Sequence, residues 1–125
     1  MAAVGLILFG HGARDARWAE PMERVKERVL AAVPHMRVAL AFLEVMEPNL
    51  ATAAQRLVAG GCRRLVIVPV FVGQGGHVRR DLAALVDALR VAHPTVDIKC
   101  AAAAGEDDTV LDALAQYCVK NLQSP

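Results

Sequence analysis

The sequence has few aromatic residues, few cysteines and no long uninterrupted apolar run. Phe, Trp and Tyr make up 4% of the 125 residues, and the cysteines are Cys62, Cys100 and Cys118. Three cysteines with no C-x-x-C pair argue against a disulfide framework and against a cysteine zinc site. No stretch reaches the roughly 18–20 apolar residues of a membrane-spanning helix, and the N-terminus lacks the basic region and cleavage site of a signal peptide. We therefore expect a cytoplasmic protein with reduced cysteines and no membrane partner.

The charge balance also lacks a dominant sign. Lys and Arg number 14 and Asp and Glu number 13, which gives a formal net charge of +1 with neutral histidine. Because the basic residues are scattered, the sequence argues against a protein that binds the nucleic-acid backbone. The length fits one domain, which we expect to span residues 1–125.

Short apolar runs indicate four buried strands. The run AVGLILF at 3–9 is continuous, as in a strand that is covered on both faces, and LVIVPVFV at 65–72 is almost wholly β-branched. A second strand is expected at 37–43 and a weaker fourth strand at 95–101.

Apolar residues at helical spacing follow each expected strand. A first helix ends at Pro34, a second runs from Pro48, as an early helical residue, to about Ala59, and a third ends at His93-Pro94. The fourth is expected over 109–122. The apolar stripes are Trp18, Met22, Val25 and Val29 in the first helix; Val78, Leu82, Leu85, Val86 and Leu89 in the third; and Leu111, Leu114, Cys118 and Leu122, facing inward, in the fourth.

Four strand–helix units with short connections predict an α/β fold. The architecture expected is three-layer, with a four-stranded parallel sheet and flanking helices on both faces. We adopt the flavodoxin-like strand order 2-1-3-4, which is the commonest arrangement for this number of strands. Ligands of such sheets bind beyond the carboxyl ends of the strands, so the residues that follow each strand carry the functional information.

Three ionisable residues follow the first three strands. His11 lies in Gly-His-Gly after the first strand, Glu44 closes the second, and His77 ends the glycine-rich loop after the third. Two imidazoles and a carboxylate at one rim favour a divalent-metal site or base chemistry. The alternatives are that His11 is a polar turn residue, that His77 only starts a helix, and that Glu47 takes the role of Glu44.

Arginines and glycines lie close to the two histidines. Gly73–Gly76 matches neither nucleotide-binding fingerprint, so these glycines are expected to let the backbone pass close to a flat or bulky group or to hold positive φ. Guanidinium groups here would pair with a polycarboxylate, although for any single one the sequence favours a solvated charge on a first helical turn. The arginines in question are Arg14, Arg17, Arg79 and Arg80. His35 and His93, each beside a proline at a helix end, are assigned no function.

Three motifs follow the strands: LFGHG at 8–12, FLE at 42–44 and PVFVGQGGHVRRDL at 69–82. On these motifs, and over nearly its whole length, the chain resembles the short sirohydrochlorin chelatases of the CbiX and SirB type, within the class II tetrapyrrole chelatases. The intervals from His11 to Glu44 and from Glu44 to His77 are both 33 residues (44 − 11 and 77 − 44) and are similar to the family's own spacing.

The resemblance implies a chelatase-like fold and insertion of a divalent metal into sirohydrochlorin, toward cobalamin or siroheme. Co²⁺ is expected first, with Fe²⁺ or Ni²⁺ as alternatives, and the metal is a substrate, so no organic cofactor is needed. By this analogy His11 and His77 bind the metal and one of them accepts a proton, while Glu44 contributes charge and proton transfer. Longer relatives contain two such units, which implies a homodimer here. Candidate substrate-binding residues are Arg14, Gly75, Gly76, Arg79 and Arg80.

The sequence departs from the family at the rim of the site. Ala13 replaces a serine, Ala83 a proline, and Ala103-Ala104 a Pro-Leu pair, so the metal-binding positions are intact and the substrate rim differs. Two other functions would use the same histidines. A histidine phosphatase is disfavoured because Gly10 stands where that family has arginine, and a non-catalytic metal or tetrapyrrole carrier would use His11 and His77 without turnover.

Overall fold

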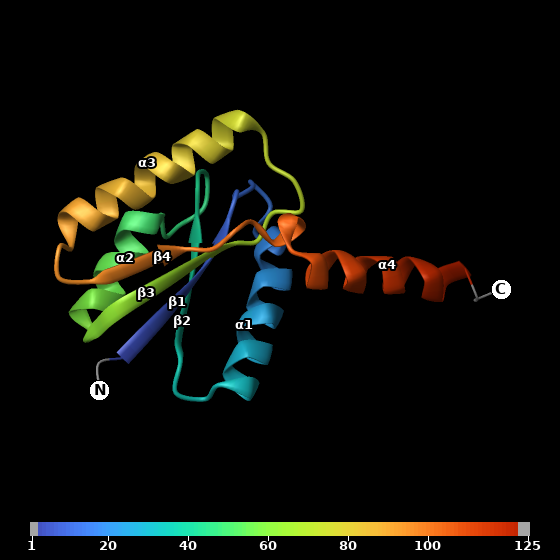
Figure 1. The fold of residues 1–125 in the computed structure, drawn as a ribbon, viewed down its shortest axis with the longest axis horizontal. Helices are drawn as coiled ribbons and strands as arrows, with labels where there is room; N and C mark the ends of the chain where they lie inside the picture. Colours follow the sequence, from blue (N-terminus) through green and yellow to red (C-terminus); the bar gives the residue numbers. More distant parts are fainter. Residues whose placement is uncertain (1–2, 123–125) are drawn as a thin grey trace.

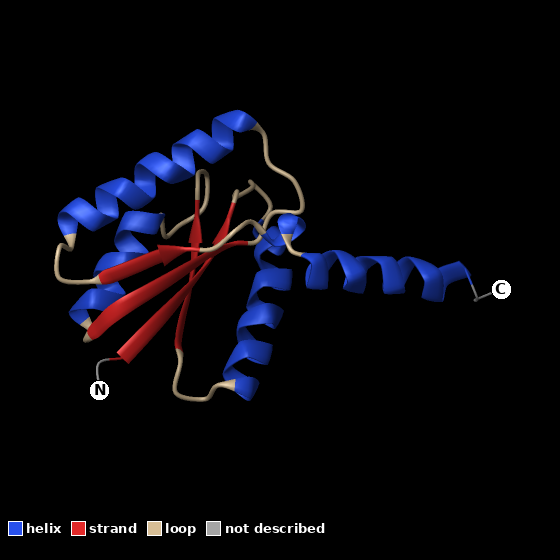
Figure 2. Cartoon of the chain, viewed as in Figure 1, coloured by secondary structure: helices blue, strands red, loops and turns tan. Residues whose placement is uncertain are grey.

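The computed structural model describes residues 3–122 and shows a four-stranded parallel sheet in the order β2-β1-β3-β4 (Figures 1 and 2). This confirms the predicted fold class and strand order. The strands are β1 (Ala3–Gly10), β2 (Arg37–Phe42), β3 (Cys62–Pro69) and β4 (Asp97–Cys100). The helices are α1 (Glu20–Ala32), α2 (Leu50–Ala59), α3 (Gly76–Ala92) and α4 (Asp108–Leu122), with short 3₁₀ turns η1 (Ala16–Ala19) and η2 (Ala104–Glu106).

The main core lies between the sheet and the pair of helices α2 and α3. Side chains that alternate along β1 and β3 point into it, because successive residues of a strand face opposite sides of the sheet. Its largest fully buried members include Phe9, Ile7, Leu65 and Ile67. A smaller cluster on the opposite face joins Leu8 and Phe42 to Met22 of α1.

The helices cover the two faces of the sheet unequally. On one face α2 and α3 lie side by side, whereas on the other α1 packs on β1 and β2. Val66 and Val68 of β3 point to this second face and remain partly exposed. The third layer is therefore built over half of the sheet in the part of the chain that the structure describes.

Three predicted boundaries are wrong by at least two residues, and one of them belongs to the fourth strand, which spans residues 97–100 instead of 95–101. The third strand spans residues 62–69 instead of 65–72, since its first residues pair with β1 and β4, and after Pro69 the chain leaves the sheet toward the glycine loop. Pro48 is not an early helical residue but precedes α2, in a cis peptide bond with Glu47. Asn49 takes the capping position, where its side chain accepts a hydrogen bond from the backbone N–H of Thr52 (2.8 Å).

The first helical stripe is also partly wrong. Met22 is buried, but Trp18 lies in η1 with 71% of its surface exposed, and Val25 of α1 is 41% exposed. Because no other α-helix within residues 3–122 packs beside α1 on its face of the sheet, its outer apolar side chains face solvent.

Helix α4 does not pack inward as expected. Leu111, Leu114, Cys118 and Leu122 are all exposed, and no residue of α4 is buried. The helix leaves the body of the domain, as the red ribbon of Figure 1 shows. Among the described residues, no helix combines the length and apolar character needed to cross a bilayer.

Candidate functional site

The central feature of the site is a His–Glu pair at the carboxyl ends of β1 and β2. The parallel pairing of these strands continues beyond them, because the N–H of Leu43 donates to the carbonyl of Gly10 (2.9 Å) and that of Glu44 to the carbonyl of His11 (3.1 Å). The two side chains therefore emerge next to each other, with Nε2 of His11 3.0 Å from Oε1 of Glu44. Both are about half exposed (50% and 60%), so incoming groups can reach them.

The backbone around this pair is tightly constrained. Gly12 has a φ of +98°, and a Cβ there would overlap the carbonyl oxygen of Glu44, so only glycine fits. Val45 has a φ of +69°, unusual for a β-branched residue, and the N–H of Met46 donates to the carbonyl of Glu44 across it (2.7 Å). Strained conformations of this kind persist where the surrounding structure enforces them, often at functional sites.

An apolar hollow of about 450 Å³ lies beside His11. Phe71 forms part of its wall, with its ring centroid 6.5 Å from that of His11 and the planes at 65°. Trp18 of η1 lines the same hollow, an aromatic group that sequence reasoning missed because it was assigned to a helical stripe. The sequence feature that pointed to Trp18 is its position: the only tryptophan of the chain follows His11 by seven residues (18 − 11). The remaining lining comes from Gly10, Gly12, Ala13, Pro21, Met22, Phe42, Met46 and Val70.

His77 stands apart from that pair, in the first turn of α3. Its Nε2 lies 3.1 Å from Oδ2 of Asp81, one helical turn on, and the His77 side chain is 80% exposed. Within residues 3–122, no group of three or more His, Cys, Asp or Glu side chains is arranged to hold a metal ion. The structure therefore shows two imidazole–carboxylate pairs, His11–Glu44 and His77–Asp81.

The candidate substrate-binding residues are spread around the same rim. Gly75 has open space around its Cα, and Gly76 has only the Arg80 guanidinium nearby. No glycine of the 73–76 loop has positive φ, so that part of the expectation is wrong: the chain enters α3 with ordinary backbone angles. Arg14 is exposed in the loop after Gly12.

The other two arginines have partners. Arg79 donates from Nη2 to Oε1 of Glu106 (2.6 Å), which joins α3 to η2. Arg17 bonds Asp15, and its guanidinium and backbone N–H hold the pKa of that carboxyl below its ordinary value. These hydrogen bonds hold Arg17 in the turn that contains Trp18.

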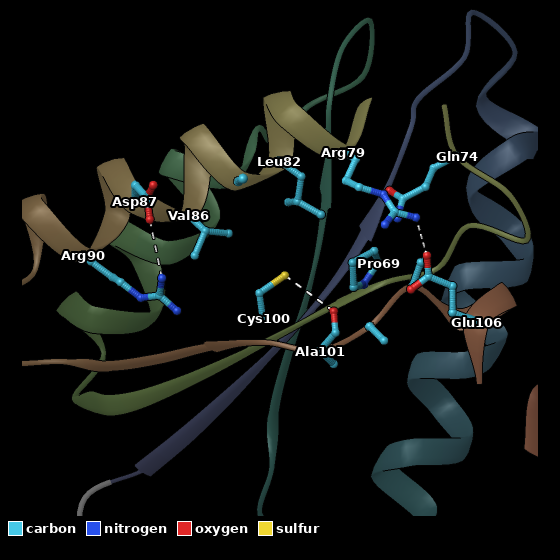
Figure 3. A pocket seen from close by; sticks show the side chains of 13 residues that line it. Pro69, Gln74, Arg79, Leu82, Val86, Asp87, Arg90, Cys100, Ala101 and Glu106 are labelled. Carbon is cyan, nitrogen blue, oxygen red and sulfur yellow. Dashed lines mark hydrogen bonds and ion pairs between the residues drawn. The ribbon is translucent and has the colours of Figure 1, made fainter. Parts of the chain in front are cut away.

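A second hollow, of about 310 Å³, lies between α3 and the end of β4 (Figure 3). The Arg79–Glu106 pair borders it, and the buried Oε1 of Gln74 has no hydrogen-bond partner among the residues that the structure describes. Cys100 also lines it, and burial raises the pKa of its thiol. This hollow lacks the histidines of the rim, so it is separate from the His11–Glu44 pair.

The chain matches the family model described as CbiX over residues 5–120. It is 29% identical to the sirohydrochlorin cobaltochelatase of Sulfolobus acidocaldarius over 119 residues, covering 95% of this chain and 93% of that protein. The sirohydrochlorin cobaltochelatase of Methanocaldococcus jannaschii is 33% identical over 92 residues, which are 70% of this chain and 62% of that protein. With the corresponding proteins of Methanococcus aeolicus and Methanopyrus kandleri, the match spans little more than half of their length (54% and 55%).

Solved structures of similar proteins have the same fold. A CbiX protein from Marinobacter aquaeolei VT8 superposes with a TM-score of 0.82 at 29% identity, covering 96% of this chain and 98% of that one. The sirohydrochlorin chelatase SirB from Bacillus subtilis subspecies spizizenii, in complex with cobalt, gives a TM-score of 0.78 at 21% identity. That match covers 94% of this chain and 50% of SirB.

Proposed function

The chain belongs to the CbiX family, and on this premise we propose that it is a sirohydrochlorin chelatase. The reaction inserts Co²⁺ into sirohydrochlorin or a related tetrapyrrole, with Fe²⁺ and Ni²⁺ as alternative metals, and serves cobalamin or siroheme biosynthesis in the cytoplasm. The observation that carries the proposal is the accessible His11–Glu44 pair, 3.0 Å apart, at the edge of an apolar hollow.

The chemistry needs a base and exchangeable ligands. The metal must lose water, and the macrocycle must lose two pyrrole protons as its nitrogens bind the metal. A neutral imidazole can bind a first-row divalent ion or accept a proton near neutral pH. Glu44, in contact with Nε2 of His11, would stabilise the imidazolium that forms when His11 takes a proton.

The remaining candidate residues are assigned supporting roles. We propose that His77, oriented by Asp81, is a second ligand or proton acceptor. Trp18 and Phe71 offer apolar surface to a flat macrocycle, and the space around Gly75 and Gly76 leaves room for its edge. We assign the exposed Arg14, Arg79 and Arg80 to pairing with its carboxylates.

A metalation assay tests the proposal. Purified protein is incubated without oxygen with sirohydrochlorin and Co²⁺, and the absorbance change of the macrocycle is followed against a protein-free control. We expect faster metalation with protein. Equal rates with and without protein would contradict the proposed enzymatic activity. If the protein then bound sirohydrochlorin tightly and stoichiometrically, a non-catalytic carrier would be favoured.

Two substitutions test which carboxylate acts beside His11. Glu44→Gln keeps the shape of the side chain but removes the charge beside His11, so we expect slower metalation. Glu47→Gln, three residues along the same loop, is the matched control and should leave the rate near that of the unmodified protein. The reverse ranking would show that Glu47 is the functional carboxylate.

A further inference from the structure

The position of His77 depends on a segment that its own neighbours in the chain support weakly. His77 is the second residue of α3, its Nε2 lies 3.1 Å from Oδ2 of Asp81 in the same helix, and its side chain is 80% exposed. The glycine loop before it is open, because a Cβ at Gly73 or Gly75 would have nothing within 4 Å. The buried residues of α3 begin only at Leu82. The first turn of α3 therefore depends on contacts with other parts of the chain.

Turn η2 contacts both ends of this loop. At the start of the loop, the N–H of Gly105 donates to the carbonyl of Phe71 (2.8 Å), and a Cβ at Gly105 would overlap the carbonyl of Val72. At the end of the loop, Nη2 of Arg79 donates to Oε1 of Glu106 (2.6 Å), and the two side chains form an ion pair. One short turn thus connects the chain before the loop to the helix after it.

The Arg79–Glu106 pair acts on the turn that contains His77. Figure 3 shows these two side chains meeting at the edge of the second hollow, between α3 and the segment after β4. Arg79 follows His77 by two residues, so the two side chains leave the helix on different sides. Val78, between them, is half-buried and packs on the main core. The first turn is therefore held by Val78 from the core and by Arg79 from η2, while His77 stays exposed.

The chemistry of the pair separates the tasks of its two members. The bond to Glu106 uses one of the five N–H donors of the guanidinium, so Arg79 can hold η2 and pair with a substrate carboxylate at the same time. Glu106 is negatively charged and 44% exposed, and its charge would repel a substrate that carries carboxylates. Glu106 therefore fits a supporting task better than direct contact with the substrate.

We propose that η2 clamps the glycine loop and that Glu106 is a positioning residue for His77. The clamp holds the first turn of α3, and His77 with it, at one place on the carboxyl edge of the sheet. This inference rests on the proposed function, because the position of His77 affects a reaction rate only if His77 takes part in metalation. The clamp itself is a property of the fold and is measurable without substrate.

Steady-state kinetics of Co²⁺ insertion separates positioning from substrate binding. Glu106→Ala removes the carboxylate that holds Arg79, and Asp108→Ala, which removes another exposed carboxylate two residues further along, is the matched control. We expect Glu106→Ala to lower kcat roughly tenfold and to leave KM for sirohydrochlorin within about twofold, since a misplaced reacting group slows the reaction without weakening binding. Glu106→Gln keeps an oxygen that can accept from Arg79 and should recover roughly half of the lost rate. Asp108→Ala should change neither constant.

Hydrogen exchange tests the clamp in the protein without substrate. The backbone N–H of Arg79 donates to the carbonyl of Gly75 (3.1 Å), which closes the first turn of α3. By nuclear magnetic resonance we expect this amide to exchange about threefold faster in Glu106→Ala than in the unmodified chain, as the loss of an exposed ion pair predicts. The amide of Leu89, late in the same helix, should exchange at the same rate in both proteins.

The two measurements separate the clamp from the proposed function. Unchanged exchange at Arg79 in Glu106→Ala would overturn the clamp. Faster exchange with an unchanged kcat would overturn the positioning of His77 by Glu106. An unmodified protein that inserts no cobalt would contradict the proposed function, and faster exchange in Glu106→Ala would then still support the clamp.

Discussion

At the scale of single residues, the site depends on how closely two backbone segments approach. The carbonyl of Glu44 lies where a Cβ of residue 12 would be, and the N–H of Glu44 bonds the carbonyl of His11. The side chains of His11 and Glu44 meet because these backbones meet. Any substitution that separates the two loops should therefore affect stability and metalation together.

Gly12→Ala is such a substitution. The new Cβ overlaps the Glu44 carbonyl and forces a φ of +98° on an alanine, so we expect a loss of about 1–3 kcal/mol in the free energy of unfolding. Urea unfolding followed by circular dichroism measures it. Gly73→Ala is the control, because nothing lies within 4 Å of a Cβ there, and it should change stability by about 0.5 kcal/mol or less. Equal losses would show that the close approach at Gly12 is unimportant.

Cys100 should respond to pH differently from an ordinary thiol. Burial raises its pKa, so the protonated thiol is favoured in the folded protein, and the stability this contributes is lost as pH rises through the raised pKa. Only the thiolate is alkylated. We expect the iodoacetamide rate at Cys100, measured by peptide mass spectrometry, to keep rising at pH values where an unfolded peptide containing the same residue has reached its plateau. Coincident profiles would contradict the shift.

The sequence predicted which residues lie at the carboxyl edge of the sheet better than it predicted the side chains that they contact. His11 and Glu44 could be placed together because the carboxyl ends of neighbouring parallel strands share one edge of the sheet. The contact of His77 with Asp81 depends on α3 beginning at Gly76, and helix boundaries are poorly determined by sequence pattern. Trp18 was missed because spacing alone does not distinguish a 3₁₀ turn from the start of a helix.

At the scale of secondary-structure elements, the start of α2 shows how capping determines a boundary. Pro48 fits the first turn of a helix, but Asn49 gives the backbone a better start, since its side chain satisfies the N–H of Thr52. The helix therefore begins one residue after the cap, at Leu50, which is buried.

Asn49→Ala should remove this cap. We expect a loss of about 1 kcal/mol in the free energy of unfolding, measured by chemical denaturation. Gln55→Ala, at an exposed position within the same helix, is the control and should lie within about 0.5 kcal/mol of the unmodified chain. If Asn49→Ala behaved like Gln55→Ala, the side-chain cap would contribute nothing measurable.

At the scale of the whole molecule, the parallel sheet could be predicted from the sequence, whereas the position of the last helix could not. The alternation of buried strands and amphipathic helices predicts parallel crossovers, and the order 2-1-3-4, adopted because it is the commonest for four strands, agrees with the structure. Spacing identifies the apolar side of α4, but it does not tell which surface that side packs on, and in the described residues it is exposed to solvent.

The most direct test of the proposed function compares two histidines in the anaerobic Co²⁺ metalation assay. His11→Ala removes the imidazole that contacts Glu44, and His35→Ala removes an exposed imidazole between α1 and β2. We predict that His11→Ala slows cobalt insertion into sirohydrochlorin on the order of a hundredfold or more, while His35→Ala keeps the rate of the unmodified protein. A folded His11→Ala variant that inserts cobalt at the unmodified rate would contradict the account.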